Sequence, residues 1–136
     1  MSTGLMHLHH YLPYLFFIVL IISIVRAALN KIQNVKKDLF LTLTLIFAHI
    51  QLLLGLVLLI PMATVVDWSG VMGNAASRFL LVEHPLTMLI AVVLITLGKV
   101  KAKKIEDNAK ANKAVFGYFM VALILIALRT PWDKLF

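Results

Sequence analysis

Four long apolar segments are the feature that most constrains how this sequence can fold. They cover approximately residues 5–28, 39–63, 76–98 and 114–130. The hydrocarbon core of a bilayer is about 30 Å thick, and an α-helix needs about 20 residues to cross it. Because a chain in lipid must pair its own backbone N–H and C=O groups, we expect each segment to be helical. The sequence therefore predicts an all-α, integral membrane four-helix bundle that forms a single domain over residues 1–136.

The composition agrees with a membrane protein. Hydrophobic residues make up 62% of the chain and charged residues 14%, whereas soluble domains average about 45–50% and about 25%. The absence of cysteine excludes disulfides, thiolate metal ligands and covalent haem attachment through cysteine. A net charge of +7 could indicate nucleic-acid binding. The basic residues instead cluster in two short segments between helices, so we expect a lipid bilayer and no nucleic acid as partner.

The distribution of basic residues predicts the orientation. Ten of the 13 Lys and Arg residues lie between the first and second apolar segments or between the third and fourth. The positive-inside rule places both of these connections in the cytoplasm, and therefore both termini outside. No Lys or Arg precedes the first apolar segment, so we expect that segment to be a retained helix rather than a cleaved signal peptide.

All five histidines lie in the outer half of the predicted bundle or near its mid-plane. His7, His9 and His10 belong to the first helix, His49 to the second and His84 to the third. Ionisable groups inside a membrane are costly unless paired, and by default they indicate a functional site. Helical periodicity places His7 and His10 on one face and His9 nearly opposite His7. We therefore expect His7 or His10 to face His84, with His49 deeper in the bilayer.

These histidines allow more than one kind of chemistry. They could ligate a haem, or bind Cu, Zn or Fe without porphyrin, since imidazole suits all three metals. The candidate metal ligands are His7, His49 and His84. Alternatively, the histidines could only hydrogen-bond to water or across helices.

The stretch LVEHPLTML, residues 81–89, starts the third apolar run in an unusual way. Pro85 cannot donate a hydrogen bond to the carbonyl of Leu81, and it disfavours α-helical geometry at His84. The residues after Pro85 are too few to span a bilayer. The sequence therefore predicts a helix that begins before Glu83 and is kinked near Pro85.

Three charged residues accompany the histidines at the outer end. Glu83 could orient an imidazole, as carboxylates do around metal-bound histidines, or it could form a salt bridge with Arg78 or Arg129. The two arginines could bind an anion such as a haem propionate. They could equally extend towards lipid headgroups.

Several stretches together carry a resemblance to a known group of proteins. They are GLMHLHHYLPYL, IFAHIQLLLGLVL, ASRFLLVEHPLTMLIAVVLITLGKVKAKK and ALRTPW. The chain resembles small four-helix membrane proteins of Bacteroidota-type bacteria that are labelled cytochrome b-like, and the resemblance covers almost its whole length. The matching site residues are His7, His9, His49, Arg78, Glu83 and His84. At position 10 this chain has His where the group usually has a small polar residue.

The resemblance implies haem b and electron transfer, with a quinone or a larger membrane complex as partner. Our leading hypothesis is a b-type haem protein that acts as a redox relay near the outer face of a bacterial inner membrane. The ligands would be His84 with His7 or His9, and His49 is the other option. Arg78 and Arg129 would neutralise the propionates, and Glu83 would orient a ligand.

Two alternatives belong to other classes. The chain could be a non-catalytic accessory subunit of a larger membrane complex, or it could hold a histidine metal site without porphyrin. In each case it would be an electron-transfer or accessory protein rather than an independent enzyme. Since no histidine lies near the inner surface, one haem at most is expected, and it would not carry electrons across the bilayer alone.

Overall fold

The computed structural model describes residues 3–130, and all regular secondary structure in this range is helical. The end of the ALRTPW stretch lies outside the described residues. The elements are α1 (Thr3–Ala28), η1 (Val35–Lys37), α2 (Leu39–Val65), α3 (Trp68–Gly73), α4 (Ala75–Arg78), the π-helical turn η2 (Phe79–Glu83), α5 (His84–Ala102) and α6 (Asn108–Arg129).

Four helical stretches are long and apolar enough to cross a membrane: Gly4–Ala28, Leu39–Val65, Ala75–Ala102 and Asn108–Arg129. The predicted all-α architecture with four membrane-spanning helices is thus confirmed at the level of length and composition. Four helices of this length and composition are typical of a multi-pass membrane protein.

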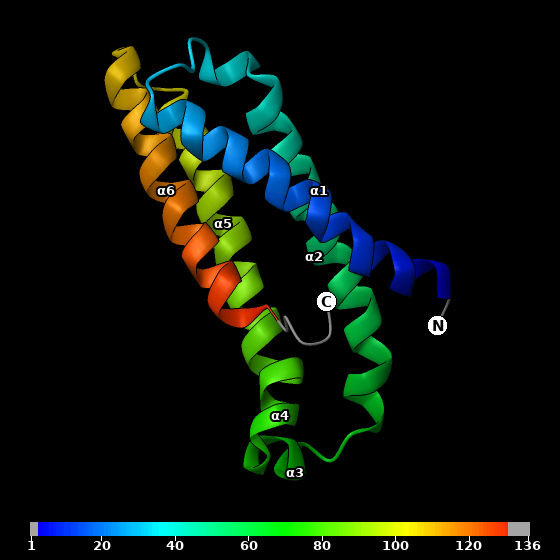
Figure 1. Cartoon of the computed structure of the whole chain (residues 1–136). Helices are drawn as coiled ribbons and strands as arrows, with labels where there is room; N and C mark the ends of the chain where they lie inside the picture. Colours follow the sequence, from blue (N-terminus) through cyan, green and yellow to red (C-terminus); the bar gives the residue numbers. More distant parts are fainter. Residues whose placement is uncertain (1–2, 131–136) are drawn as a thin grey trace.

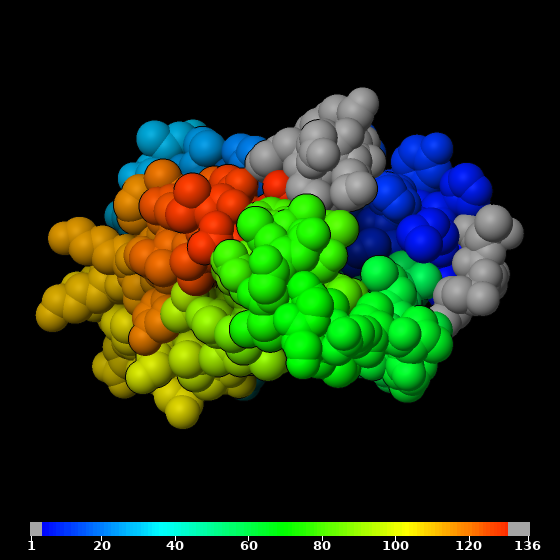
Figure 2. All heavy atoms as spheres, turned by 90° about the horizontal axis from the view of Figure 1, so that it is seen from below, coloured from blue at the N-terminus to red at the C-terminus, as the bar shows by residue number. Residues whose placement is uncertain are grey.

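The long helices alternate in direction and form a bundle (Figure 1). α1 packs against α2 and α6, and α5 packs against the same two helices. The two basic connections, residues 29–38 and 103–107, lie together at one end, which we call the basic end. The connection through α3 and α4 lies at the opposite end and covers much of it when the molecule is viewed from below (Figure 2).

The third span starts before Glu83, as predicted, and runs from Ala75 to Ala102. Its distortion takes the form of the π turn η2, in which the His84 N–H donates to the carbonyl of Phe79, five residues back. Pro85, which lacks an N–H, follows directly in the first turn of α5. Pro85 has no N–H to donate, and the wider π turn accommodates it so that the helix continues.

The connection between the second and third spans is partly helical. Its Asp, Asn, Ser and Gly residues are typical of a loop, but it contains α3 and α4. The Asp67 side chain caps the first turn of α3, and the Asn74 side chain caps that of α4. The Trp68 indole N–H donates to the carbonyl of Ala63 at 3.1 Å, which ties α3 to the end of α2. Residues that looked like loop formers therefore act as helix caps.

Helix α6 begins at Asn108, before its apolar segment, because the Asp107 side chain caps its first turn. One turn later, Asn112 is almost completely buried. Its Oδ1 accepts from the Ile32 N–H at 3.1 Å, and its Nδ2 donates to the Ile32 carbonyl at 2.8 Å. A single side chain thereby pairs both backbone groups of a fully buried loop residue and fixes the first connection to α6.

Polar side chains in the basic half of the bundle are paired with one another. The hydroxyls of Ser23 and Thr44 lie 3.2 Å apart between α1 and α2, and both residues are fully buried. Arg26 donates to both carboxylate oxygens of Asp38, at 2.8 and 2.7 Å. Burial raises the pKa of Asp38, but hydrogen bonds from Arg26 and from the Leu41 N–H outweigh it, so that the pKa lies below its usual value.

The core of the basic half is tightly packed. Its fully buried apolar side chains are Leu20, Ile32, Leu41, Ile95, Val115 and Phe119. Gly98 allows α5 and α6 to pack closely. A Cβ built on it would lie only 2.7 Å from the Cβ of Tyr118. Small residues commonly permit such approach between membrane helices.

We predict that Gly98→Ala destabilises the bundle by about 1–3 kcal/mol, since overpacking forces backbone shifts. The measurement is unfolding of the purified protein in mild detergent. Gly117→Ala is the matched control, because a Cβ there meets no atom within 4 Å. Removing that helical glycine should leave stability unchanged or raise it slightly. Equal stability of the two variants would contradict the proposed close contact.

Candidate functional site

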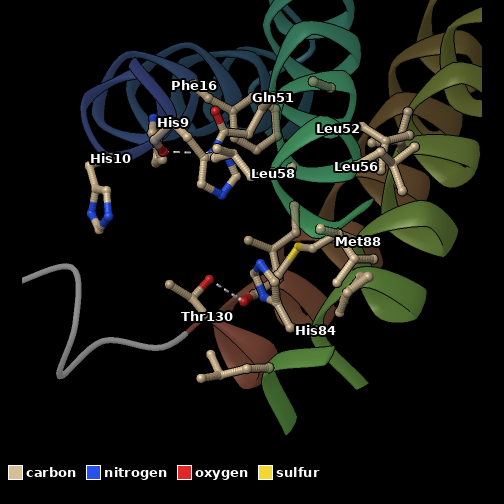
Figure 3. Close-up of a pocket in the computed structure, with 18 of the residues that line it drawn as sticks. His9, His10, Phe16, Gln51, Leu52, Leu56, Leu58, His84, Met88 and Thr130 are labelled. Carbon is tan, nitrogen blue, oxygen red and sulfur yellow. Dashed lines mark hydrogen bonds between the residues drawn. The ribbon is translucent and has the colours of Figure 1, made fainter. Parts of the chain in front are cut away.

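A cavity of about 300 Å³ lies in the half of the bundle away from the basic end. It is bounded by α1, α2, η2, α5 and the end of α6, and its walls are mostly apolar. Its polar side chains are His9, His10, Gln51, His84 and Thr130. Figure 3 shows these five side chains and several of the apolar residues around them. A concave, mostly apolar site with a few polar groups is the usual form of a small-molecule or cofactor site.

His9 enters the cavity from α1 and packs against α2 at Gly55. A Cβ built on Gly55 would lie 3.2 Å from the Cε1 atom of His9, so the glycine makes room for the imidazole. The Nδ1 atom of His9 is buried and has no hydrogen-bond partner. A buried polar atom without a partner is costly, and it points to a ligand or water at the site.

His84 enters the same cavity from the start of α5 (Figure 3). Its Nδ1 lies 2.7 Å from the backbone carbonyl of Arg129. Because a carbonyl oxygen can only accept, Nδ1 must carry the proton, and the neutral ring then has its lone pair on Nε2. Metal-ligating histidines are typically oriented in this way, by a bond from one ring nitrogen to a backbone carbonyl or carboxylate.

The structure thus brings His84 together with His9 rather than with His7. His10, the other expected partner, also lines the cavity but stands at its edge in Figure 3. Periodicity correctly separated His7 and His9 onto different faces of α1. It did not indicate which face turns inward, because apolar residues surround this helix on all sides.

Gln51 was missed by the sequence analysis. Its Nε2 donates to the backbone carbonyl of His9 at 2.9 Å, and its Oε1 is buried without a partner. A signal for it existed, since a glutamine in the middle of an apolar membrane helix is itself unusual.

His7 and His49 do not line the cavity. His7 is exposed, and its ring stacks on Tyr11 with centroids 6.2 Å apart. His49 is also exposed on α2, and its Nδ1 donates to the carbonyl of Leu45 at 2.7 Å. Its Nε2 makes a loose contact of 3.5 Å with the hydroxyl of Thr96 on α5.

The charged candidates lie outside the cavity lining as well. Arg78 donates to the carbonyl of Met72 at 2.9 Å and forms a loose ion pair with Glu83, with Nε and Oε2 3.9 Å apart. This pair corresponds to the structural alternative considered for Glu83. Arg129 contributes its backbone carbonyl to His84, while its side chain is not among those that line the cavity.

A metal site of three side chains is not found in the part of the chain that the structure describes. Within residues 3–130, no three His, Asp or Glu side chains gather closely enough to hold a metal ion. The set His7, His49 and His84 is therefore not brought together. The chemically notable group is therefore the imidazoles that line one apolar cavity, with His9 and His84 inside it and His10 at its edge.

Comparisons with known protein families, with curated proteins and with solved structures give no significant match. Any function must therefore be argued from the geometry of the site.

We predict that Gly55→Val moves the His9 ring, because a side chain at this position would occupy the space of the imidazole. The measurement is the imidazole NMR spectrum of histidine-labelled protein in detergent, with His9 assigned from a His9→Gln variant. The His9 signals should shift strongly and those of His49 should not. Gly117→Val, on an open part of α6, is the control. Unchanged His9 signals in Gly55→Val would show that the ring is not seated there.

Proposed function

We propose that this chain is a membrane-embedded b-type haem protein in which His9 and His84 would hold the haem. The observation that carries the proposal is that imidazoles from two different helices, α1 and α5, share one apolar cavity. Axial ligation by two histidines requires this arrangement, with the two rings on separate helices at one level of a bundle.

The residues present fit such a group. His84 has its Nδ1 committed to the Arg129 carbonyl, which leaves Nε2 free to ligate. His9 has a buried Nδ1 that lacks a partner, so its ring is not satisfied by the protein alone. The side chains of Phe16, Leu52 and Met88 provide apolar walls. When bound, a b-type haem supplies reversible one-electron transfer.

The chain's own residues would then bind the group, exclude water and set its potential. Burial in an apolar cavity and the hydrogen bonds behind the ligands are the main controls of potential available to a protein. Within the described residues no Lys or Arg lines the cavity. Arg78 and Arg129 stay candidates for balancing propionate charge from outside it, and Arg129 is the better one because its carbonyl already contacts His84.

The position of the cavity supports a relay near one face. It occupies only the half away from the basic end, while the basic half is filled by the apolar core and by paired polar groups such as Ser23 and Thr44. We propose that the basic end is cytoplasmic in a bacterial inner membrane, so that the site lies near the outer face. The partner would be a quinone or a larger membrane complex.

The orientation can be tested on a chain that contains no natural cysteine. Ser69→Cys, on the exposed α3, should react with a membrane-impermeant maleimide on intact spheroplasts. Lys104→Cys, in the exposed second basic connection, should react only after lysis. The reverse pattern would contradict the assignment of the basic end to the cytoplasm.

The haem proposal is tested by absorption spectra of protein purified in mild detergent from cells with ample haem. The wild type should show a Soret band and a sharp α band on reduction with dithionite. His9→Ala and His84→Ala should each lose most of the bound haem. His7→Ala and His49→Ala should keep it and serve as matched controls, since neither residue lines the cavity.

Two results would contradict the proposal. A wild-type protein that is colourless and free of haem by extraction would remove the cytochrome function and favour an accessory role. Loss of haem from the His49 or His7 variants, with retention in the His9 and His84 variants, would place the ligands elsewhere. Circular dichroism of each variant checks that the helices are intact.

A further inference from the structure

In the part of the chain that the structure describes, two buried side-chain N and O atoms lack a hydrogen-bond partner, and both belong to one contact between α1 and α2. They are His9 Nδ1 and Gln51 Oε1. The amide of Gln51 is already anchored at this residue, since its Nε2 donates to the His9 carbonyl at 2.9 Å. Because Oε1 and Nε2 share one carbon atom, the unpaired oxygen lies beside His9 as well.

The anchoring bond fixes which end of the amide is available. The His9 carbonyl can only accept, so the NH₂ group of Gln51 must face it and Oε1 must be the remaining end. A rotated amide would place two oxygens against each other. Gln51 therefore offers the His9 ring an acceptor and no second donor in that direction.

This acceptor discriminates between the two neutral forms of the His9 ring. With the proton on Nδ1, the two unpaired atoms are a donor and an acceptor, and a rotation of the two side chains can join them in a direct hydrogen bond. With the proton on Nε2, both atoms are acceptors, and neither can satisfy the other. The second form leaves two buried acceptors unpaired in an apolar site, which is unfavourable.

We propose that Gln51 is a positioning residue that holds His9 in its Nδ1–H tautomer, through a direct hydrogen bond from Nδ1 to Oε1. The Nε2 lone pair of His9 is then directed away from this bond and is available to a ligand. His84 reaches the same protonation state through the Arg129 carbonyl. Both imidazoles then have an unprotonated Nε2 atom, which can donate its electron pair to a ligand in the cavity.

The tautomer can be tested on the protein without any cofactor. In ¹⁵N-histidine-labelled protein in detergent, at a pH where the rings are neutral, the nitrogen shifts distinguish N–H from bare nitrogen. Wild-type His9 should show Nδ1–H in about tenfold excess. Gln51→Leu should remove most of that excess, and Gln51→Glu, whose carboxylate also accepts, should keep it.

Gln33→Leu is the matched control, because Gln33 is an exposed glutamine in the first basic connection. It should leave the His9 signals unchanged. The proposal is overturned if wild-type His9 carries its proton on Nε2, or if Gln51→Leu leaves the tautomer as it is in the wild type. Loss of folding in Gln51→Leu would be recognised from the signals of His49. Gln51→Met, which has a similar length but no amide, then replaces it, with the same expected loss of the Nδ1–H excess.

The redox consequence of this inference rests on the proposed function. In haem-loaded protein, a stronger acceptor behind His9 makes the imidazole a better donor and favours the oxidised state. Gln51→Glu should therefore lower the midpoint potential and Gln51→Leu should raise it. A haem-free wild type would remove the proposed function while the NMR experiment still decides the tautomer. If the haem-loaded wild type and the Gln51 variants have the same midpoint potential and the same His9 tautomer, this inference is overturned and the proposed function stands.

Discussion

A polar atom that is buried among apolar side chains needs a partner, and this constraint organises both halves of the bundle. In the basic half the constraint is met within the chain. Asn112 pairs both backbone groups of Ile32, and Ser23 contacts Thr44. In the other half, His9 and Gln51 each keep a buried atom without a partner. The basic half is packed and supports the fold, whereas the other half contains the cavity and these two unpaired atoms.

The cavity depends on how the packed half fixes the helices. The close approach of α5 and α6 at Gly98 and the attachment of the first connection to Asn112 hold the bundle together at the basic end. Towards the other end, the helices enclose the cavity instead of a core. There the π turn leads the chain into α5 and places His84 within reach of the Arg129 carbonyl at the end of α6. The hydrogen bond between His84 and Arg129 thereby joins α5 to the end of α6 beside the cavity.

Much of the fold could be predicted because hydropathy and length determine membrane spans, including the start of the third helix before Glu83. The short helices α3 and α4 were missed because capping residues such as Asn74 resemble loop residues in sequence. The lining of the cavity could be predicted only in part. His84 lines it, but whether His9 or His7 faces it depends on the rotation of α1, which a uniformly apolar helix does not reveal. Gln51 is uncharged, so the cost of burying a charge in lipid does not single it out.

In the proposed function, the imidazoles of His9 and His84 would hold one haem in this cavity. Electron paramagnetic resonance of the oxidised wild-type protein tests it most directly, because spin state and signal shape report on both axial ligands. We expect a low-spin ferric signal typical of two imidazoles, with one haem for each chain. A high-spin signal, a low-spin signal typical of another ligand pair, or protein that contains no haem would contradict the assignment of His9 and His84.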